Sequence, residues 1–418
     1  MRGDTLPFGL RPKRPCVIRA LSGPAKVIHA MNALIDHGRL AVPSEPAGSA
    51  RRAVRVAMVT NIPTPYRIPI YELLSEVPGL DLQVFFCSGR EPDRHWDLEQ
   101  LRVRHAFLRE RCIAWSGRFI HANPDVWPRL REFAPDVVIT TGFNPTHLIA
   151  FALAMLRGAR HVAMTDGTAD SEASLSFVHR WLRRLVYSRS HAFIGASEGS
   201  FELYRRFGVA ESALFKSHLC ANNPAYEAAA RPRRDIDLIY CGRWVASKSP
   251  LFAIEVAAAA GRRLGRRVVL LLLGAGELEG EMRRAADNAV LWVDARFGGF
   301  ARQSALPGHY ARSRLLLFPS AGEPWGVVAN EACAAGVPVI VSPHAGAAND
   351  LVRDGDNGRV LPLDAAVWSD AVLELLVDGA AWRRMSRRCV ELVRDYTYAN
   401  ATAGIAAAVA HAVAEKRA

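Results

Sequence analysis

The chain has no apolar stretch long enough to cross a membrane. Its longest apolar runs, residues 148–156 and 268–273, fall far short of the roughly 20 consecutive residues that a membrane-spanning helix needs. We therefore expect no transmembrane helix.

The chain also lacks closely paired cysteines. The seven cysteines are scattered and form no Cys-x-x-Cys motif, so the sequence suggests neither a zinc site nor a disulfide framework. This usage suits a reducing compartment, and we expect a cytoplasmic protein. The cysteines are Cys16, Cys87, Cys112, Cys220, Cys241, Cys333 and Cys389.

Acidic side chains are in the minority. The 418 residues include 53 Lys and Arg but 41 Asp and Glu, which gives a formal net charge of +12. Nucleic acid, an anionic membrane surface and phosphorylated small molecules would all suit this charge, and net charge alone does not choose among them. A hydrophobic content of 50% describes an ordinary globular protein, and the length allows two domains with sizeable cores.

Residues 1–52 carry few acids and no regular pattern. They are rich in Arg, Pro and small residues, and they lack both strand alternation and the continuous apolar segment of a signal peptide. We expect a disordered extension outside the fold, or a start codon placed too early.

Short apolar strands alternate with helices over residues 53–223. A buried strand begins at Val54, and further strands are predicted near residues 82–86, 136–140, 161–164 and 191–196, with helices between them. This alternation predicts a parallel sheet with helices on both faces. Ligands of such sheets bind at the carboxyl ends of the strands, so Asn61 to Arg67, residues 141–144 and residues 165–168 should share one rim.

A second series follows a predicted linker at residues 224–234, where Pro, Ala and Arg replace periodic structure. Over residues 235–395 we expect strands at 236–240, 268–273, 290–293, 315–318 and 337–342, again separated by helices. The sequence thus predicts an α/β protein with two doubly wound, Rossmann-like domains that face each other across a cleft.

The stretch from Arg314 to Leu361 carries the most chemistry. It is predicted to form a strand, a loop with Glu323, a helix with Glu331 and a second strand. A carboxylate in such a loop can hydrogen-bond ligand hydroxyls, while the first amides of the helix, at Gly326, Val327 and Val328, can hold phosphate oxygens. The stretch suits an anionic, polyhydroxylated ligand, although either carboxylate alone would be typical of a solvated acid.

Two weaker motifs precede this stretch. Arg243 and Lys248 follow a strand, where two cations can neutralise a diphosphate without a metal, although two solvated basic residues would give the same pattern. Gly274 and Gly276 form a Gly-x-Gly turn, which either admits a ligand to the backbone or only turns the chain. The third glycine of a dinucleotide fingerprint is missing.

Taken in order, these motifs resemble glycosyltransferase family 4, whose members are retaining enzymes with the GT-B fold. The similarity covers residues 235–364 and includes Pro-Ser-x-x-Glu-Pro-Trp-Gly, with Glu331 eight residues after Glu323. Gly299-Phe300, residues 336–340, Gly346 and residues 356–358 agree as well. In the first half, residues 61–67 resemble a variant first loop, and residues 396–418 resemble the helix that crosses back to the first domain.

The resemblance implies transfer of a sugar from a nucleoside-diphosphate sugar to an acceptor hydroxyl, with retention of configuration and with no cofactor or metal. Arg243 and Lys248 would hold the diphosphate and stabilise the departing nucleoside diphosphate. Glu323 would bind hydroxyls of the transferred sugar, Glu331 the ribose and Phe300 the base. The remaining donor contacts would come from Gly274, Gly276, Gly326, Val327 and Val328, and the facing rim from Asn61, Pro65 and Tyr66.

One position departs from the family pattern. Many members carry a sugar-contacting histidine in the first domain, and Asp166 stands at the matching place here. We expect Asp166 in the cleft, although a helix N-cap would explain an aspartate equally well. The acceptor, a glycan, a lipid-linked molecule or a small molecule, would bind on this side.

Residues 177–187 combine basic and aromatic side chains on one predicted helix. Such a composition suits a helix that lies on an anionic membrane, at the inner face. We favour an ordinary surface helix whose Phe177, Trp181 and Leu185 pack inward.

Three other functional classes would explain part of this sequence pattern. A GT-B nucleotide-sugar epimerase would share the architecture, but the combination of Arg243, Lys248, Glu323 and Glu331 favours transfer. A nucleic-acid-binding protein would explain the charge, but the sequence contains no recognised motif for it. A Rossmann oxidoreductase would need glycines after the first strand, and residues 61–67 contain none.

Overall fold

The computed structural model describes residues 52–91, 100–115, 118–169, 172, 175–229 and 234–414. The predicted N-terminal extension lies outside these residues, apart from Arg52, which donates a hydrogen bond of 2.6 Å to Asp136. Organised structure begins at Val54, as the sequence predicts.

The first sheet has seven parallel strands in the order β3-β2-β1-β6-β7-β8-β9. The chain runs outward from β1 to β2 and β3 on one side and from β6 to β9 on the other. The loops after β1 and β6 therefore leave in opposite directions, which creates a topological switch point of the kind where such sheets bind ligands. The strands are β1 (Val54–Thr60), β2 (Leu80–Phe86), β3 (His105–Phe107), β6 (Val137–Thr140), β7 (Arg160–Thr165), β8 (Ala192–Gly195) and β9 (Leu214–Lys216).

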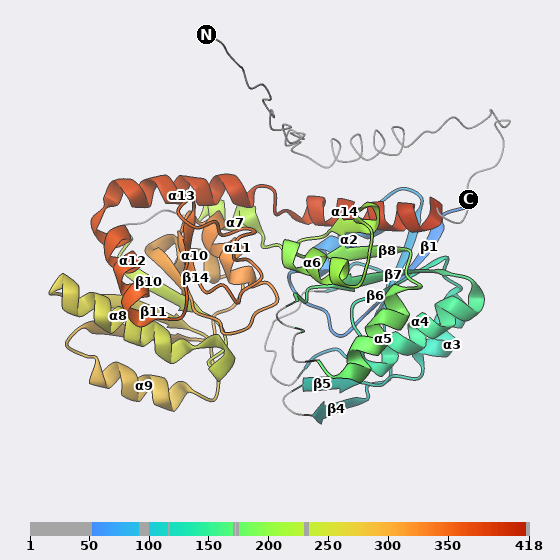
Figure 1. The fold of residues 1–418 in the computed structure, drawn as a ribbon, viewed down its shortest axis with the longest axis horizontal. Coiled ribbons are helices and arrows are strands. Elements are labelled where there is room, and N and C mark those ends of the chain that lie inside the picture. Colours follow the sequence, from blue (N-terminus) through green and yellow to red (C-terminus); the bar gives the residue numbers. More distant parts are fainter. Residues whose placement is uncertain are drawn as a thin grey trace, which may run out of the picture. The chain divides into compact units, whose positions relative to one another are not determined.

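Helices cover this sheet, and the last helix of the chain is one of them. Helix α14 lies beside α2 (Figure 1). In α14 the side chains of Ala401, Ile405 and Val409 are buried in the same core as Val56 of β1, and Thr402 donates a hydrogen bond of 3.2 Å to the Ile70 carbonyl of α2. The elements are α2 (Ile68–Ser75), α3 (Val126–Phe133), α4 (Pro145–Arg157), α5 (Phe177–Tyr187), α6 (Glu198–Arg206), a 3-10 turn at Glu211–Ala213, α14 (Tyr398–Ala414) and an antiparallel hairpin of β4 (Cys112–Trp115) and β5 (Arg118–His121).

The second sheet has six parallel strands in the order β12-β11-β10-β13-β14-β15. Its switch point lies between β10 and β13, so the loops after these two strands adjoin at one edge. The strands are β10 (Ile236–Cys241), β11 (Val268–Leu273), β12 (Val293–Gly299), β13 (Ser313–Phe318), β14 (Val339–Val341) and β15 (Gly358–Val360). Two parallel, doubly wound sheets confirm the predicted α/β fold.

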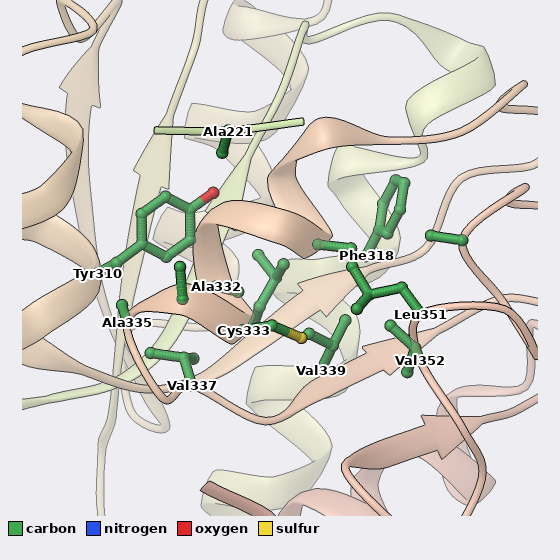
Figure 2. Close-up of a cluster of buried hydrophobic side chains, with 14 of the residues drawn as sticks. Ala221, Tyr310, Phe318, Ala332, Cys333, Ala335, Val337, Val339, Leu351 and Val352 are labelled. Carbon is green, nitrogen blue, oxygen red and sulfur yellow. The ribbon is translucent and has the colours of Figure 1, made fainter. Parts of the chain in front are cut away.

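A buried cluster fixes helix α11 against the second sheet. Figure 2 shows Cys333 of this helix beside Val339 of β14, with Ala332 of the helix and Phe318 of β13 in the same buried cluster. The helices of this half are α7 (Asn223–Ala228), a 3-10 turn at Ala246–Lys248, α8 (Pro250–Leu264), α9 (Glu279–Asn288), α10 (Leu306–Arg312), α11 (Val327–Ala334), α12 (Ala365–Val377) and α13 (Gly379–Val393).

One predicted strand has the wrong bounds, and part of the predicted linker is helical. The strand predicted at residues 290–293 begins only at Val293, because Val290 and Leu291 belong to the exposed turn after α9, at 53% and 75% exposure. Part of the predicted linker is helical: α7 begins at Asn223, and a proline is tolerated in its first turn because the amide there needs no partner. Residues 230–233 of that linker lie outside the described part of the chain.

The predicted packing of α5 is wrong for its aromatic residues. Phe177 and Trp181 are 75% and 54% exposed, whereas Arg183, Val186 and Tyr187 are buried. Arg183 donates two hydrogen bonds to Glu172, of 2.5 and 2.7 Å, which satisfy its buried charge and turn the aromatic face outward. Of the helices in the described ranges, none has the length and apolar character that a bilayer crossing needs.

Candidate active site

Loops from neighbouring strands of the second sheet meet around one cavity of about 330 Å³. Because β10 lies between β11 and β13, the loops after these strands bring Arg243, Gly274 and Glu323 to one edge. Eleven predicted residues line the cavity: Pro65, Tyr66, Arg243, Lys248, Gly274, Phe300, Glu323, Gly326, Val327, Val328 and Glu331. Tertiary structure therefore gathers most of the predicted site.

Lys248 and Glu323 form an ion pair inside this cavity. Their side chains are 15% and 23% exposed, so the pair is shielded but reachable. The Lys248 ammonium also lies 3.5 Å from both the Ser320 hydroxyl and the Gly322 carbonyl. The pair thus joins the loop after β10 to the loop after β13 and places a cation beside a carboxylate.

Backbone hydrogen bonds hold the Glu323 loop in place. The Glu323 amide donates to the His344 carbonyl at 3.1 Å, and the Gly346 amide donates to the Glu323 carbonyl at 2.9 Å. The Tyr240 hydroxyl shares its one proton between the carbonyl oxygens of Arg243 and Lys248, which lie 3.1 and 3.2 Å away, and this contact fixes the facing loop. Both charged side chains are therefore carried by preorganised backbone.

Helix α11 points its N-terminus at the cavity. Gly326 is its N-cap residue, with φ of 96°, and no side chain caps the helix. The first amides of a helix lack intrahelical partners, so Gly326, Val327 and Val328 offer donors and the positive end of a dipole to an anion. Because Lys248 and Arg243 line the same space, the cavity favours a negatively charged ligand.

Glu331 lies one turn further along α11 and is 4% exposed. Its carboxylate accepts hydrogen bonds from the Tyr310 hydroxyl at 3.0 Å and from the Gln303 amide at 3.4 Å. Burial raises the pKa of Glu331 to about 7, since a charged carboxylate is poorly solvated there. The residue can thus change protonation near neutral pH.

The two predicted glycines have different surroundings. Gly274 lines the cavity, whereas Gly276 is not among the described residues that line it. A Cβ atom on Gly274, whose φ is 139°, would come within 1.9 Å of the Gly242 carbonyl oxygen, so a larger residue is excluded by the neighbouring loop. Gly276 likewise packs against the backbone of Trp244. Both positions serve loop packing, and Gly274 also faces the cavity.

Sequence reasoning missed several residues that line the cavity. Arg302 and Gln303 follow the predicted Phe300 at the end of β12, and Arg302 adds a further cation to the lining. Residues that follow the end of a parallel strand are candidates for ligand binding, but the sequence pattern places the end of this strand too early to indicate these two. Cys241 also lines the cavity, and burial raises the pKa of its thiol to about 12, so it is not a thiolate nucleophile.

The remaining predicted residues line a second cavity of about 190 Å³ beside the first sheet. Asn61 and Asp166 lie there, and Tyr66 lines both cavities. Asp166 forms an ion pair with Arg67, whose side chain is 7% exposed, and it is not the cap of the following helix, which begins after Ser176. Arg67 belongs to the predicted rim of residues 61–67, whereas Glu91 is a lining residue that no sequence motif indicated.

Comparisons with known proteins agree with this architecture. Residues 226–391 match the family model described as glycosyl transferases group 1. A D-inositol 3-phosphate glycosyltransferase of Nocardia farcinica is 25% identical over 60% of this chain and 58% of its own length. A glycogen synthase of Mycobacterium tuberculosis is 29% identical over 70% of this chain and 75% of its own length. The chain thus spans little more than half of the first relative.

Solved structures show the same fold. Anabaena Alr3699/HepE, in complex with UDP and glucose, superposes with a TM-score of 0.68 at 15% identity, over 85% of this chain and 99% of that one. WaaG, a glycosyltransferase involved in lipopolysaccharide biosynthesis, superposes with a TM-score of 0.58 at 16% identity, over 84% and 99%. Residues 226–391 thus belong to the group 1 glycosyl transferases, and the two doubly wound sheets have the GT-B architecture.

Proposed function

We propose that this chain transfers a sugar from a nucleoside-diphosphate sugar to an acceptor hydroxyl, with retention of configuration and without a metal, as a member of glycosyltransferase family 4. The observation that carries the proposal is the meeting of Lys248 and Glu323 at the open end of α11. A cation and free amides suit a diphosphate, and a carboxylate beside them suits the hydroxyls of the attached sugar.

In the proposed reaction the acceptor oxygen bonds to the anomeric carbon as the bond from that carbon to the distal phosphate oxygen breaks. The acceptor proton passes to the departing nucleoside diphosphate, so no side chain need accept it. Lys248, Arg243 and the α11 amides stabilise the negative charge that develops on the leaving group. Glu323 orients the sugar, and Glu331 with Phe300 holds the nucleoside.

Ligand-induced thermal stabilisation tests this function. A panel of nucleoside diphosphates, NAD and short DNA is added to the full chain with and without EDTA. We expect stabilisation by at least one nucleoside diphosphate, unchanged by EDTA and weakened in Lys248→Met. Stabilisation by NAD or DNA, with no stabilisation by any nucleoside diphosphate, would reject the proposal. If a nucleoside diphosphate stabilises the chain, product analysis with nucleotide sugars identifies the donor.

A nucleotide-sugar epimerase is distinguished by its products. The second cavity, which adjoins the first through Tyr66, supports transfer because it leaves room for an acceptor. A transferase forms a new glycoside when acceptor is supplied. Conversion of the nucleotide sugar to an epimer with no glycoside formed would identify the alternative activity.

We further propose that α5 contacts an anionic membrane surface and brings the enzyme to its inner face, where a lipid-linked acceptor is within reach. Phe177, Val178 and Trp181 are 75%, 61% and 54% exposed, and the basic side chains of Arg180 and Arg184 are also exposed on this helix. Aromatic insertion combined with attraction to anionic headgroups is typical of interfacial helices.

Vesicle flotation tests the membrane contact. Binding to phosphatidylglycerol vesicles, absent with phosphatidylcholine alone, should fall in the double variant Trp181→Ser and Arg184→Glu. Arg183 is unsuitable for this test because its guanidinium is buried against Glu172. A matched control is Trp127→Ser on α3, which is 38% exposed. Equal flotation of the double variant and the wild type would dismiss the proposed contact.

A further inference from the structure

The second cavity has a charge pattern opposite to that of the first. Arg67, Glu91 and Asp166 are the charged side chains among the described residues that line it. The rest of its polar lining is neutral, with hydroxyl and amide groups from Thr60, Asn61, Thr64, Thr141 and Thr165. Its volume is about 190 Å³.

The one cation in this described lining is already engaged. The Arg67 guanidinium donates hydrogen bonds to the Ser217 carbonyl and to the Ser217 hydroxyl, each 3.3 Å long, and it forms the ion pair with Asp166. The Arg67 side chain is 7% exposed, which leaves little of it for a ligand. Among the described residues of this lining, the carboxylates of Glu91 and Asp166 therefore outnumber the one cation, and that cation is engaged.

Both carboxylates are held in place by buried groups. Asp166 is oriented by Arg67 while its own side chain stays 38% exposed. The Glu91 carboxylate lies 3.1 Å from the Nε2 atom of His121, which is fully buried, and the Glu91 side chain is 13% exposed. Oriented carboxylates are strong acceptors for hydroxyl protons and repel a second anion.

We propose that the acceptor is an uncharged polyol or sugar, bound through its hydroxyls by Asp166 and Glu91, and that phosphorylated acceptors are excluded from this cavity. This inference rests on the proposed transfer function, because it assigns the acceptor of that reaction. Among the described lining residues, cations outnumber carboxylates around the donor diphosphate, whereas carboxylates outnumber cations around the acceptor. Tyr66, which lines both cavities, stands between them.

Paired probes test the acceptor class. Binding of myo-inositol, glucose and mannose is compared with that of their monophosphates by saturation-transfer NMR, on the full chain saturated with the nucleoside diphosphate that stabilises it. We expect the neutral member of at least one pair to bind and its monophosphate to bind at least about tenfold more weakly. Tighter binding of the monophosphates, or no binding of any neutral member, would overturn the inference.

Variants assign the effect to the cavity. Glu91→Gln should weaken binding of the neutral probe and lower the discrimination against its monophosphate about tenfold. Asp166→Asn should have the same two effects if the variant folds. Glu76→Gln, an exposed acid at the end of α2, should leave both values unchanged. Equal discrimination in Glu91→Gln and the wild type would refute the assignment. Because the nucleoside diphosphate is measured first, failure of the transfer function itself is seen separately as loss of that binding.

Discussion

At the scale of single residues, Lys248 is the side chain whose removal should affect catalysis most directly. Lys248→Met keeps the aliphatic stem and removes the charge that faces Glu323 and the cavity. If this charge stabilises the leaving diphosphate, kcat should fall about a hundredfold. The rate of nucleoside diphosphate release measures the effect.

A matched surface variant controls for general charge loss. Arg283→Ala removes an exposed arginine of α9 that pairs with Glu279 and is not among the described residues that line the cavity. Its rate should equal that of the wild type. If Lys248→Met and Arg283→Ala have the same rate, Lys248 has no part in the chemistry.

Glu331 gives the site a pH dependence with a definite sign. The pKa of this buried carboxyl is about 7 in the fold against an ordinary value of 4.5, so the native state holds a proton that the unfolded state has released. Stability therefore decreases as pH rises from 4.5 to 7, by about 3 kcal/mol in total. Glu331→Gln cannot ionise, so this loss should be absent from it.

Thermal unfolding at pH 5.5 and pH 8 checks the Glu331 prediction. The unfolding temperature of Glu331→Gln, relative to that of the wild type, should rise between these two pH values. Nucleoside diphosphate binding to the variant should weaken if Glu331 holds the ribose. A constant difference in unfolding temperature at both pH values would contradict the raised pKa.

At the scale of elements, the entry into α11 depends on Gly326. Its φ of 96° suits glycine, and a Cβ atom there would come within 2.1 Å of the Phe318 ring. Gly326→Ala should cost about 1–3 kcal/mol of stability and weaken anion binding, because the first turn of α11 must shift. Gly322→Ala lies in the same loop, where a Cβ atom meets no atom within 4 Å, and should be neutral. Calorimetric titration of a nucleoside diphosphate measures both variants, and equal affinities would argue against an α11 anion site.

At the scale of the whole molecule, Asp350 joins the two sheets. Its carboxylate accepts hydrogen bonds from the Glu198 amide at 2.8 Å and from the Tyr396 hydroxyl at 2.6 Å, and its side chain is 9% exposed. Asp350→Ala should lower the free energy of unfolding by about 2 kcal/mol, since both donors lose a charged acceptor. Denaturant titration measures it. Asp370→Asn, at a surface pair 63% exposed, is the control, and equal midpoints for the two variants would show that the junction does not depend on Asp350.

Much of the donor cavity was predictable because parallel sheets obey a simple rule. Once strands were recognised before Arg243, Gly274 and Glu323, their loops had to open at one edge, and the structure gathers them there. The rule fails where local pattern misplaces a strand. Val290 and Leu291 are apolar but exposed, so the sequence pattern places the strand before Phe300 too early and gives no indication of Arg302.

The sequence by itself determined the alternation of strands and helices, the α/β class and the donor-side motifs, because periodicity and strand-end loops are local properties of the chain. Only the tertiary structure decided which distant groups satisfy each buried charge. Arg67 meets Asp166 from 99 residues away, and Arg183 meets Glu172, which turns Phe177 and Trp181 outward. Such pairings follow from the desolvation of charges within a packed fold, which no single stretch of sequence contains.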